Sequence, residues 1–105
     1  MIFPMNTPMF DLLSLSITAK GDSYGYQLSQ KIKKVSGSKD STLYPILKRL
    51  QEQGFLTVYD QPFQGRNRRY YQITDAGRQR CRTLMEEWKL YKEAVDQIIE
   101  GGSEE

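Results

Sequence analysis

The chain has 105 residues, of which 38% are hydrophobic and 27% charged, a composition suited to one folded domain with a single core. No run approaches the roughly 20 apolar residues of a membrane-spanning helix, and the first ten residues do not resemble a secretion signal. There is no histidine and a single cysteine, so the commonest metal ligand, the commonest general base and a disulfide framework are all missing. We therefore expect a cytoplasmic protein that is not an enzyme and uses no metal or cofactor.

The net charge of +2 conceals a strong polarity along the chain. Residues 20–82 contain thirteen Lys or Arg against five Asp or Glu, whereas residues 83–105 contain two against seven. The basic middle should attract a polyanion such as nucleic acid, and the acidic end should not.

The first predicted helix covers residues 8–20. Thr7 would cap it, with Pro8 at the first helical position, and Gly21 would end it. The stretch "LLSLSITA" also alternates between apolar and polar residues, as a strand does, but the cap and the glycine favour a helix.

A second helix is predicted after Gly21, with Asp22 or Ser23 as its cap. Its apolar residues recur at spacings of four and three, which predicts one buried stripe. That stripe would consist of Tyr24, Leu28, Ile32 and Val35.

A third helix is predicted from about Ser41 to Gln53, with Gly54 as the residue that ends it. Pro45 is tolerated best in a first helical turn, so we expect the helix to begin at Ser41 or Thr42. Its buried side would carry Leu43, Leu47 and Leu50.

After Gly54 the apolar period changes to two, which indicates strands. "FLTVYDQ" and "RRYYQI" predict a β-hairpin, and the intervening "PFQGRN" predicts a loop longer than the tight two-residue kind. Neighbouring residues of a strand point to opposite faces. One of Tyr70 and Tyr71 should therefore pack on the core while the other stays partly exposed.

The last predicted helix covers residues 75–100, with Thr74 as its cap and a frayed tail at 101–105. Apolar residues spaced by three and four predict a heptad seam of roughly two and a half repeats. The seam consists of Cys81, Leu84, Trp88, Tyr91, Val95 and Ile98. Such a helix is too long for this small domain to cover, so we expect it to pack against a partner chain.

The order of three helices followed by a hairpin is that of a winged helix-turn-helix, so the fold class should be mainly α with a small β-hairpin. We expect a DNA-binding domain over residues 1–74 and a dimerisation helix over 75–100. The free side of the third helix would enter a major groove, and a basic hairpin loop would reach the neighbouring backbone or minor groove. The candidate DNA contacts are Lys39, Ser41, Thr42, Tyr44, Lys48 and Arg49, with Arg66, Asn67 and Arg68 from the wing.

Three stretches, "YGYQLSQKI", "STLYPILKRLQEQGFL" and "GRNRRYYQITDAGR", together resemble the PadR family of bacterial transcription regulators. The resemblance covers about residues 10–82, and the pairing of the last two stretches is its most specific part. It implies a dimeric repressor whose C-terminal helix makes most of the dimer interface. With one such helix, the chain is similar to the short, multidrug-sensing branch of the family.

The resemblance also implies roles for the seam. Trp88 matches a tryptophan that lies at the dimer centre of the drug sensors and stacks on flat aromatic ligands, so Leu84, Trp88 and Tyr91 are candidate ligand contacts. Tyr91 could instead narrow or fill the central cavity. The implied dimer interface consists of Met9, Leu12, Cys81, Leu84, Trp88, Tyr91, Val95 and Ile98.

The leading hypothesis is therefore a homodimeric repressor that binds double-stranded operator DNA with an inverted repeat. A planar aromatic or drug-like effector at the dimer centre would relieve repression. Two alternatives remain open. One is a constitutive repressor without a ligand, and the other is a protein-interaction module whose wing charges meet an acidic partner.

Overall fold

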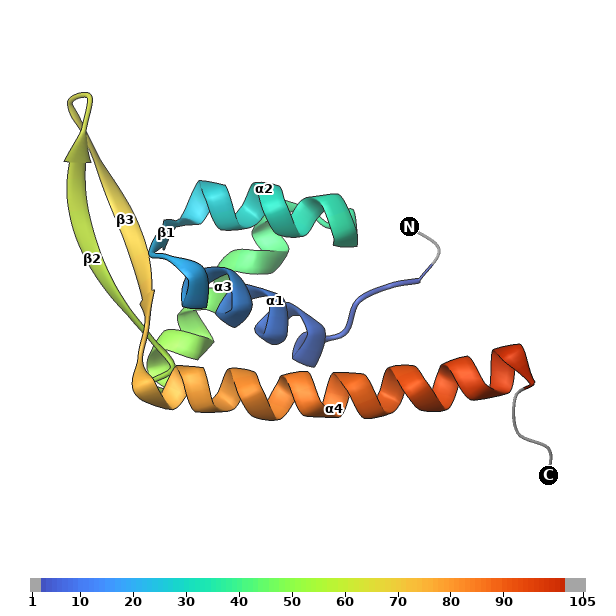
Figure 1. The fold of residues 1–105 in the computed structure, drawn as a ribbon. Coiled ribbons are helices and arrows are strands. Elements are labelled where there is room, and N and C mark those ends of the chain that lie inside the picture. Colours follow the sequence, from blue (N-terminus) through green and yellow to red (C-terminus); the bar gives the residue numbers. More distant parts are fainter. Residues whose placement is uncertain (1–2, 102–105) are drawn as a thin grey trace.

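The structure is a computed structural model that describes residues 3–101. Its elements are α1 (Thr7–Lys20), β1 (Ser23–Tyr24), α2 (Gly25–Ser36), α3 (Asp40–Glu52), β2 (Leu56–Phe63), β3 (Arg66–Ile73) and α4 (Asp75–Glu100). Helices α1, α2 and α3 pack together, the β2–β3 hairpin projects from one end of them, and α4 extends well past the other end (Figure 1). Gly101 caps α4 in the left-handed conformation, and the rest of the expected frayed tail lies outside the described residues.

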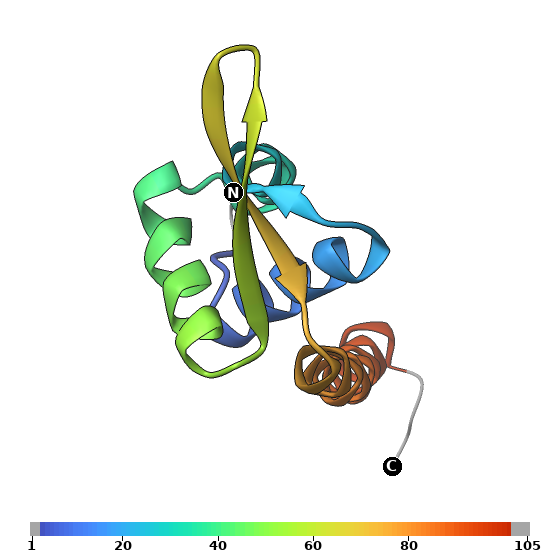
Figure 2. The same ribbon diagram turned by 90° about the vertical axis from the view of Figure 1, so that its left-hand side faces the viewer.

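The expected fold class is confirmed, with one addition. The strands form a three-stranded antiparallel sheet in the order β1-β3-β2, and the two-residue β1 pairs Ser23 with Tyr71 and Tyr24 with Tyr70. Viewed with the hairpin toward the reader, α3 lies on one side of it and α4 is seen end-on, directed away (Figure 2). No helix within residues 3–101 has both the length and the apolar character needed to cross a membrane.

The prediction for the start of the second helix was wrong. Tyr24 lies in β1 and is the N-cap of α2, so neither Asp22 nor Ser23 caps the helix. The side chain of Gln27 accepts a hydrogen bond from the backbone N–H of Tyr24 at 3.2 Å. Val35 is 50% exposed, so Leu28 and Ile32 alone remain of the predicted stripe. Pairing with β3 displaced Tyr24 from the helix, which local periodicity could not reveal.

The other helix starts were nearly correct. The side chain of Asn6, rather than Thr7, caps α1 by accepting from the N–H of Met9 at 3.1 Å. Helix α3 begins at Asp40, one residue before the predicted range, with Lys39 as its N-cap. Pro45 therefore lies in the second turn, where its missing N–H leaves a carbonyl one turn earlier without the usual helical partner.

The hairpin differs from the prediction at its tip. The two strands pair from Leu56 with Ile73 as far as Phe63 with Arg66, so the turn contains only Gln64 and Gly65. Both have positive φ, at 50° and 79°, the conformation that a tight type I′ turn requires. The predicted longer loop was wrong because pairing continues past Pro62, which an edge strand tolerates.

The core lies among α1, α2, α3 and the base of the hairpin. The predicted buried leucines Leu43, Leu47 and Leu50 are all at most 3% exposed. Helix α4 contributes Cys81 and Leu84, and no described side chain after Leu84 is buried. The core side chains are Phe10, Leu12, Leu15, Leu28, Ile32, Leu43, Leu47, Leu50, Leu56, Tyr71, Ile73, Cys81 and Leu84.

The start of α4 lies very close to the backbone at the base of the hairpin. As predicted, Thr74 caps α4, since its hydroxyl oxygen accepts from the N–H of Gly77 at 3.0 Å. The same hydroxyl donates to the carbonyl of Gly54 at 2.7 Å. A Cβ at Gly77 would collide with the carbonyl oxygen of Phe55 and lie 2.8 Å from Cγ1 of Ile73. The start of α4 is thus held against the base of the hairpin.

We predict that Gly77→Ala lowers the free energy of unfolding by about 1–3 kcal/mol, because the backbone must shift to admit the methyl group. Chemical denaturation followed by circular dichroism measures this. Gly21→Ala is the matched control, since its Cβ would meet nothing within 4 Å and its φ of 162° is extended. Its effect should stay within about 0.5 kcal/mol, and equal losses in both variants would refute the tight joint.

Candidate nucleic-acid interface

Side chains of the hairpin alternate between two faces, and the two faces have different surroundings. Tyr71 is 8% exposed and belongs to the core, whereas Tyr70 is half-buried, which confirms the predicted split between the two tyrosines. By alternation, Asn67 and Arg69 share the inner face with Tyr71. Arg68 shares the outer face with Tyr70.

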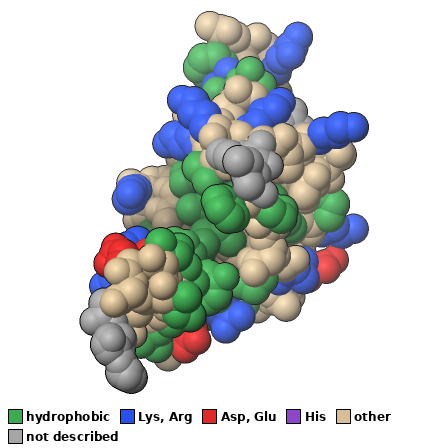
Figure 3. All heavy atoms as spheres, turned by 90° about the vertical axis from the view of Figure 1, so that its right-hand side faces the viewer, with side chains coloured by type: hydrophobic (Ala, Val, Ile, Leu, Met, Phe, Trp, Pro, Cys, Tyr) green, Lys and Arg blue, Asp and Glu red, His purple; other side chains and the backbone are tan. Residues whose placement is uncertain are grey.

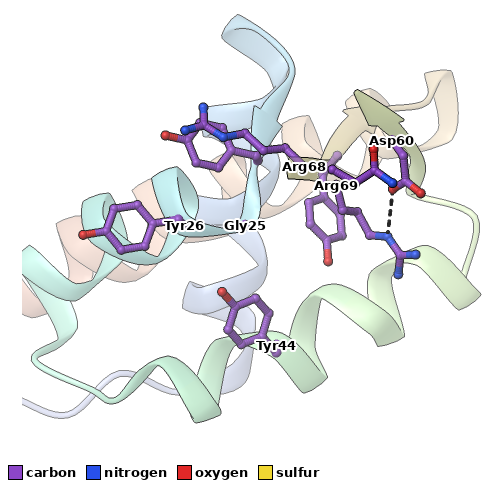
Figure 4. Close-up of a pocket in the computed structure, with 9 residues that line it drawn as sticks. Gly25, Tyr26, Tyr44, Asp60, Arg68 and Arg69 are labelled. Carbon is purple, nitrogen blue, oxygen red and sulfur yellow. Dashed lines mark ion pairs between the residues drawn. The ribbon is translucent and has the colours of Figure 1, made fainter. Parts of the chain in front are cut away.

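A hollow of about 540 Å³ lies between this inner face, the start of α2 and the exposed side of α3. Figure 4 shows Tyr26 and Tyr44 on the helices, and Asp60 and Arg69 on the hairpin. A Cβ at Gly25 would lie only 3.1 Å from Cε1 of Tyr44, so this glycine lets the Tyr44 ring lie close to α2. The lining residues are Tyr24, Gly25, Tyr26, Tyr44, Asp60, Asn67, Arg68, Arg69 and Tyr71.

The exposed side of α3 carries most of the residues that the sequence suggested for DNA contact. Tyr44 is 45% exposed and borders the hollow. Hydroxyls lie near the start of the helix, where its dipole is positive, and a cation lies nearly two turns further on. The exposed candidates here are Lys39, Ser41, Thr42, Tyr44 and Lys48.

Arg49 differs from these residues because its guanidinium is engaged inside the chain. It lies 2.5 Å from the carboxylate of Asp11, whose side chain is 8% exposed, and donates to Gln53 at 3.0 Å. A buried carboxylate is costly without a partner. Arg49 therefore holds α3 against α1.

The outer face of the hairpin holds a cluster of aromatic rings around Arg68. The Arg68 guanidinium lies 3.7 Å from the centre of the Phe63 ring and 4.2 Å from that of Tyr24. Tyr70 packs edge-on against Tyr24 and is stacked on Tyr59 at 5.5 Å. These contacts hold the wing against β1, so Arg68 is part of the support of the hairpin.

The cluster also connects the wing to the turn after α1. The Tyr59 hydroxyl donates to Asp22 at 2.7 Å, and this hydrogen bond to a carboxylate raises the pKa of Tyr59 above its usual value. Burial similarly raises the pKa of Tyr71. Both phenols therefore stay protonated at neutral pH.

Sequence reasoning missed Arg69, Tyr26 and Asp60, and it placed Arg66 and Asn67 in a loop. Both lie on strand β3 instead, where the direction of each side chain can be predicted once one neighbour is known to be buried. Counting back by twos from a buried Tyr71 would have selected Arg69 and Asn67 for the inner face.

A second hollow, of about 270 Å³, lies between the start of α1 and the middle of α4. It brings the three candidate ligand contacts, Leu84, Trp88 and Tyr91, together with Met9 and Leu12. The rings of Trp88 and Tyr91 are 6.1 Å apart and tilted by 34°. Figure 3, which faces the free end of α4, shows hydrophobic side chains gathered along α4 and toward the helices above it.

The predicted seam divides into two parts along α4. Leu12, Cys81 and Leu84 are already buried within the chain, and Cys81 Sγ lies 3.5 Å from the hydroxyl of Ser16 on α1. Tyr91 is 65% exposed. Ile98 is 84% exposed and Trp88 38% exposed, while Val95 is half-buried. The later half of the seam therefore has surface left for another molecule.

Among residues 3–101, no three His, Cys, Asp or Glu side chains lie close enough together to hold a metal ion.

Known proteins resemble this chain in both sequence and structure. The crystal structure of a Streptococcus mutans protein is 45% identical, with a TM-score of 0.93 over 100% of this chain and 99% of that one. A PadR family transcription regulator from Clostridium difficile is 29% identical, with a TM-score of 0.78 over 86% of this chain and 97% of its own.

Bacillus subtilis PadR, crystallised in complex with operator DNA, is 26% identical, with a TM-score of 0.64 over 71% of this chain and 45% of its own. The model of the transcriptional regulator PadR-like family matches residues 14–83, which confirms the resemblance seen in the sequence. The chain belongs to the PadR-like family of transcriptional regulators.

Proposed function

We propose that the chain is a DNA-binding repressor that acts as a homodimer on an inverted-repeat operator. The observation that carries this proposal is the hollow between α3 and the inner face of the wing. Tyr26 and Tyr44 of the helices line one side of it, and Asn67, Arg68 and Arg69 of the wing line the other. Bacillus subtilis PadR, which was crystallised with operator DNA, has a related fold and supports DNA binding as the function.

In the proposed complex, α3 lies in the major groove and the wing follows the adjacent backbone. Tyr44 and the hydroxyls of Ser41 and Thr42 face base edges, while Lys39 and Lys48 contact phosphates. Phosphate contacts set register and affinity, and base contacts set specificity. From the wing we assign Arg66, Asn67 and Arg69 to DNA. Arg49 and Arg68 position α3 and the hairpin.

The homodimer is proposed from the exposed half of the α4 seam. A helix that carries Trp88, Tyr91 and Ile98 past the rest of the fold presents an apolar stripe that a second copy would cover. A two-fold axis along this stripe gives each copy the same contacts. Two recognition helices about 34 Å apart would then meet successive major-groove faces.

A planar aromatic ligand at the dimer centre is proposed from the second hollow. Trp88 borders it from α4 and Met9 from α1, so a stacked ligand would contact both helices. Such a ligand relieves repression only if it binds unequally to dimers with different spacings of the DNA-binding heads. A constitutive repressor, with Trp88 covered by the partner, is the rival regulator.

We predict that Arg69→Ala weakens binding to duplex DNA from upstream of the protein's own gene by about tenfold, because a phosphate or base contact is lost. Fluorescence anisotropy at two salt concentrations, with a scrambled duplex alongside, measures this. Arg82→Ala removes an exposed arginine of α4 outside the hollow and should bind like the wild type. Equal, weak and sequence-blind binding by all three proteins would favour the protein-interaction module.

We predict that Ile98→Glu raises the dimer dissociation constant by about tenfold or more, because an unpaired carboxylate would be buried in the seam. Sedimentation velocity over a concentration series measures this. Leu90→Glu is the control, since Leu90 is 60% exposed but lies off the heptad seam. If both variants dimerise like the wild type, α4 does not form the interface.

We predict that a planar cationic dye quenches the fluorescence of Trp88, the single tryptophan, at micromolar concentration and releases the protein from DNA. Quenching of N-acetyltryptophanamide by the same dye gives the collisional background. Saturable quenching above that background supports an open site beside Trp88. Quenching equal to the background would support the constitutive repressor.

A further inference from the structure

Asp60 is an unexpected residue in a surface that should attract phosphate. It is the acidic member of the nine described residues that line the hollow between α3 and the wing. Its carboxylate lies 3.5 Å from Nε of Arg69, its direct cross-strand partner. Figure 4 shows this ion pair on the side of the hairpin that faces the hollow. A surface built only for phosphate affinity would have no carboxylate there.

The pair is exposed enough to exchange partners. The side chains of Arg69 and Asp60 are 61% and 53% exposed, and an ion pair in contact with water contributes little to stability. The hairpin has other support, because Arg68 is held between Phe63 and Tyr24 on the outer face. Support of the wing therefore does not account for a carboxylate on the inner face.

We propose that Asp60 is a specificity-determining residue that lowers affinity for generic DNA by occupying Arg69. This inference depends on the DNA-binding function proposed above. A phosphate that approaches Arg69 must displace the Asp60 carboxylate, and the two negative groups then repel each other at short range. Every duplex presents phosphates, so this cost applies to all DNA and is offset only where other contacts form.

At a matching sequence the contacts of α3 with base edges offset this cost, because they form only there. The cost then falls mainly on DNA that lacks the matching bases. Discrimination is a difference between affinities, and an unfavourable contact with the wrong partner increases it as effectively as a favourable contact with the right one.

The test compares wild type with Asp60→Asn on a scrambled 30-base-pair duplex by fluorescence anisotropy over a series of salt concentrations. We expect the variant to bind about fivefold more tightly near 0.1 M salt. The slope of log affinity against log salt should become steeper by about 0.9 for each phosphate contact that an Arg69 side chain gains. Thermal unfolding verifies that the fold is unchanged.

Asp96→Asn is the matched control. Asp96 pairs with Lys92 at 3.1 Å, and the two side chains are 43% and 59% exposed, so this variant also removes one carboxylate from an exposed ion pair. It lies on α4, far along the chain from the wing. Equal gains in the two variants would show an effect of net charge alone and overturn the proposal.

Arg69→Ala separates masking from simple repulsion. If Asp60 acts by occupying Arg69, Asp60→Asn gives little gain in the Arg69→Ala background. If Asp60→Asn increases the affinity for DNA just as much in the Arg69→Ala background, Asp60 does not act by occupying Arg69. If the wild type binds DNA and Asp60→Asn binds with the same affinity, this inference is overturned and the proposed function stands. Failure of every variant to bind the scrambled duplex and the upstream duplex overturns both.

Discussion

Burial of Tyr71 between the hairpin and the helices determines which side of the wing faces α3. Because strand residues alternate, this one ring places Asn67 and Arg69 on the inner face and Arg68 on the outer face, although Arg68 also borders the hollow. The pairing of β1 with β3 secures the arrangement, since it brings the Tyr24 ring against Tyr70 and Arg68. The inner face lines the hollow, while Arg68 and Tyr70 on the outer face contact aromatic rings of the protein.

Helix α1 is the common neighbour of the two surfaces to which we assign functions. Through Asp11 it holds Arg49 of α3, and through Ser16 it contacts Cys81 of α4. Its first turns also border the hollow beside Trp88. In the proposed dimer, the DNA-facing helix α3 and the dimerisation helix α4 would both be held by α1. A change at the dimer centre would therefore change the distance between the two DNA-binding heads.

Local patterns predicted the elements well where the deciding interactions lie within one element. The apolar spacing of α3 identified Leu43, Leu47 and Leu50 as buried, and the cap at Thr74 identified the start of α4. Errors occurred where a distant segment decides. Tyr24 fits the periodicity of α2 but pairs with Tyr70 in the sheet, and the hairpin closes in a tight turn because its strands pair along their whole length.

The sequence by itself determined the fold class, the family, the buried leucines and the long apolar seam, because periodicity, capping and turn residues act over a few neighbouring positions. Only the tertiary structure decided which cations are available. Arg49 is bound to a residue 38 positions away, and the Arg68 guanidinium contacts rings from β1 and β2. Arg69 faces the hollow beside Asp60. These outcomes depend on contacts between residues far apart in the chain, for which a single sequence carries no local signal.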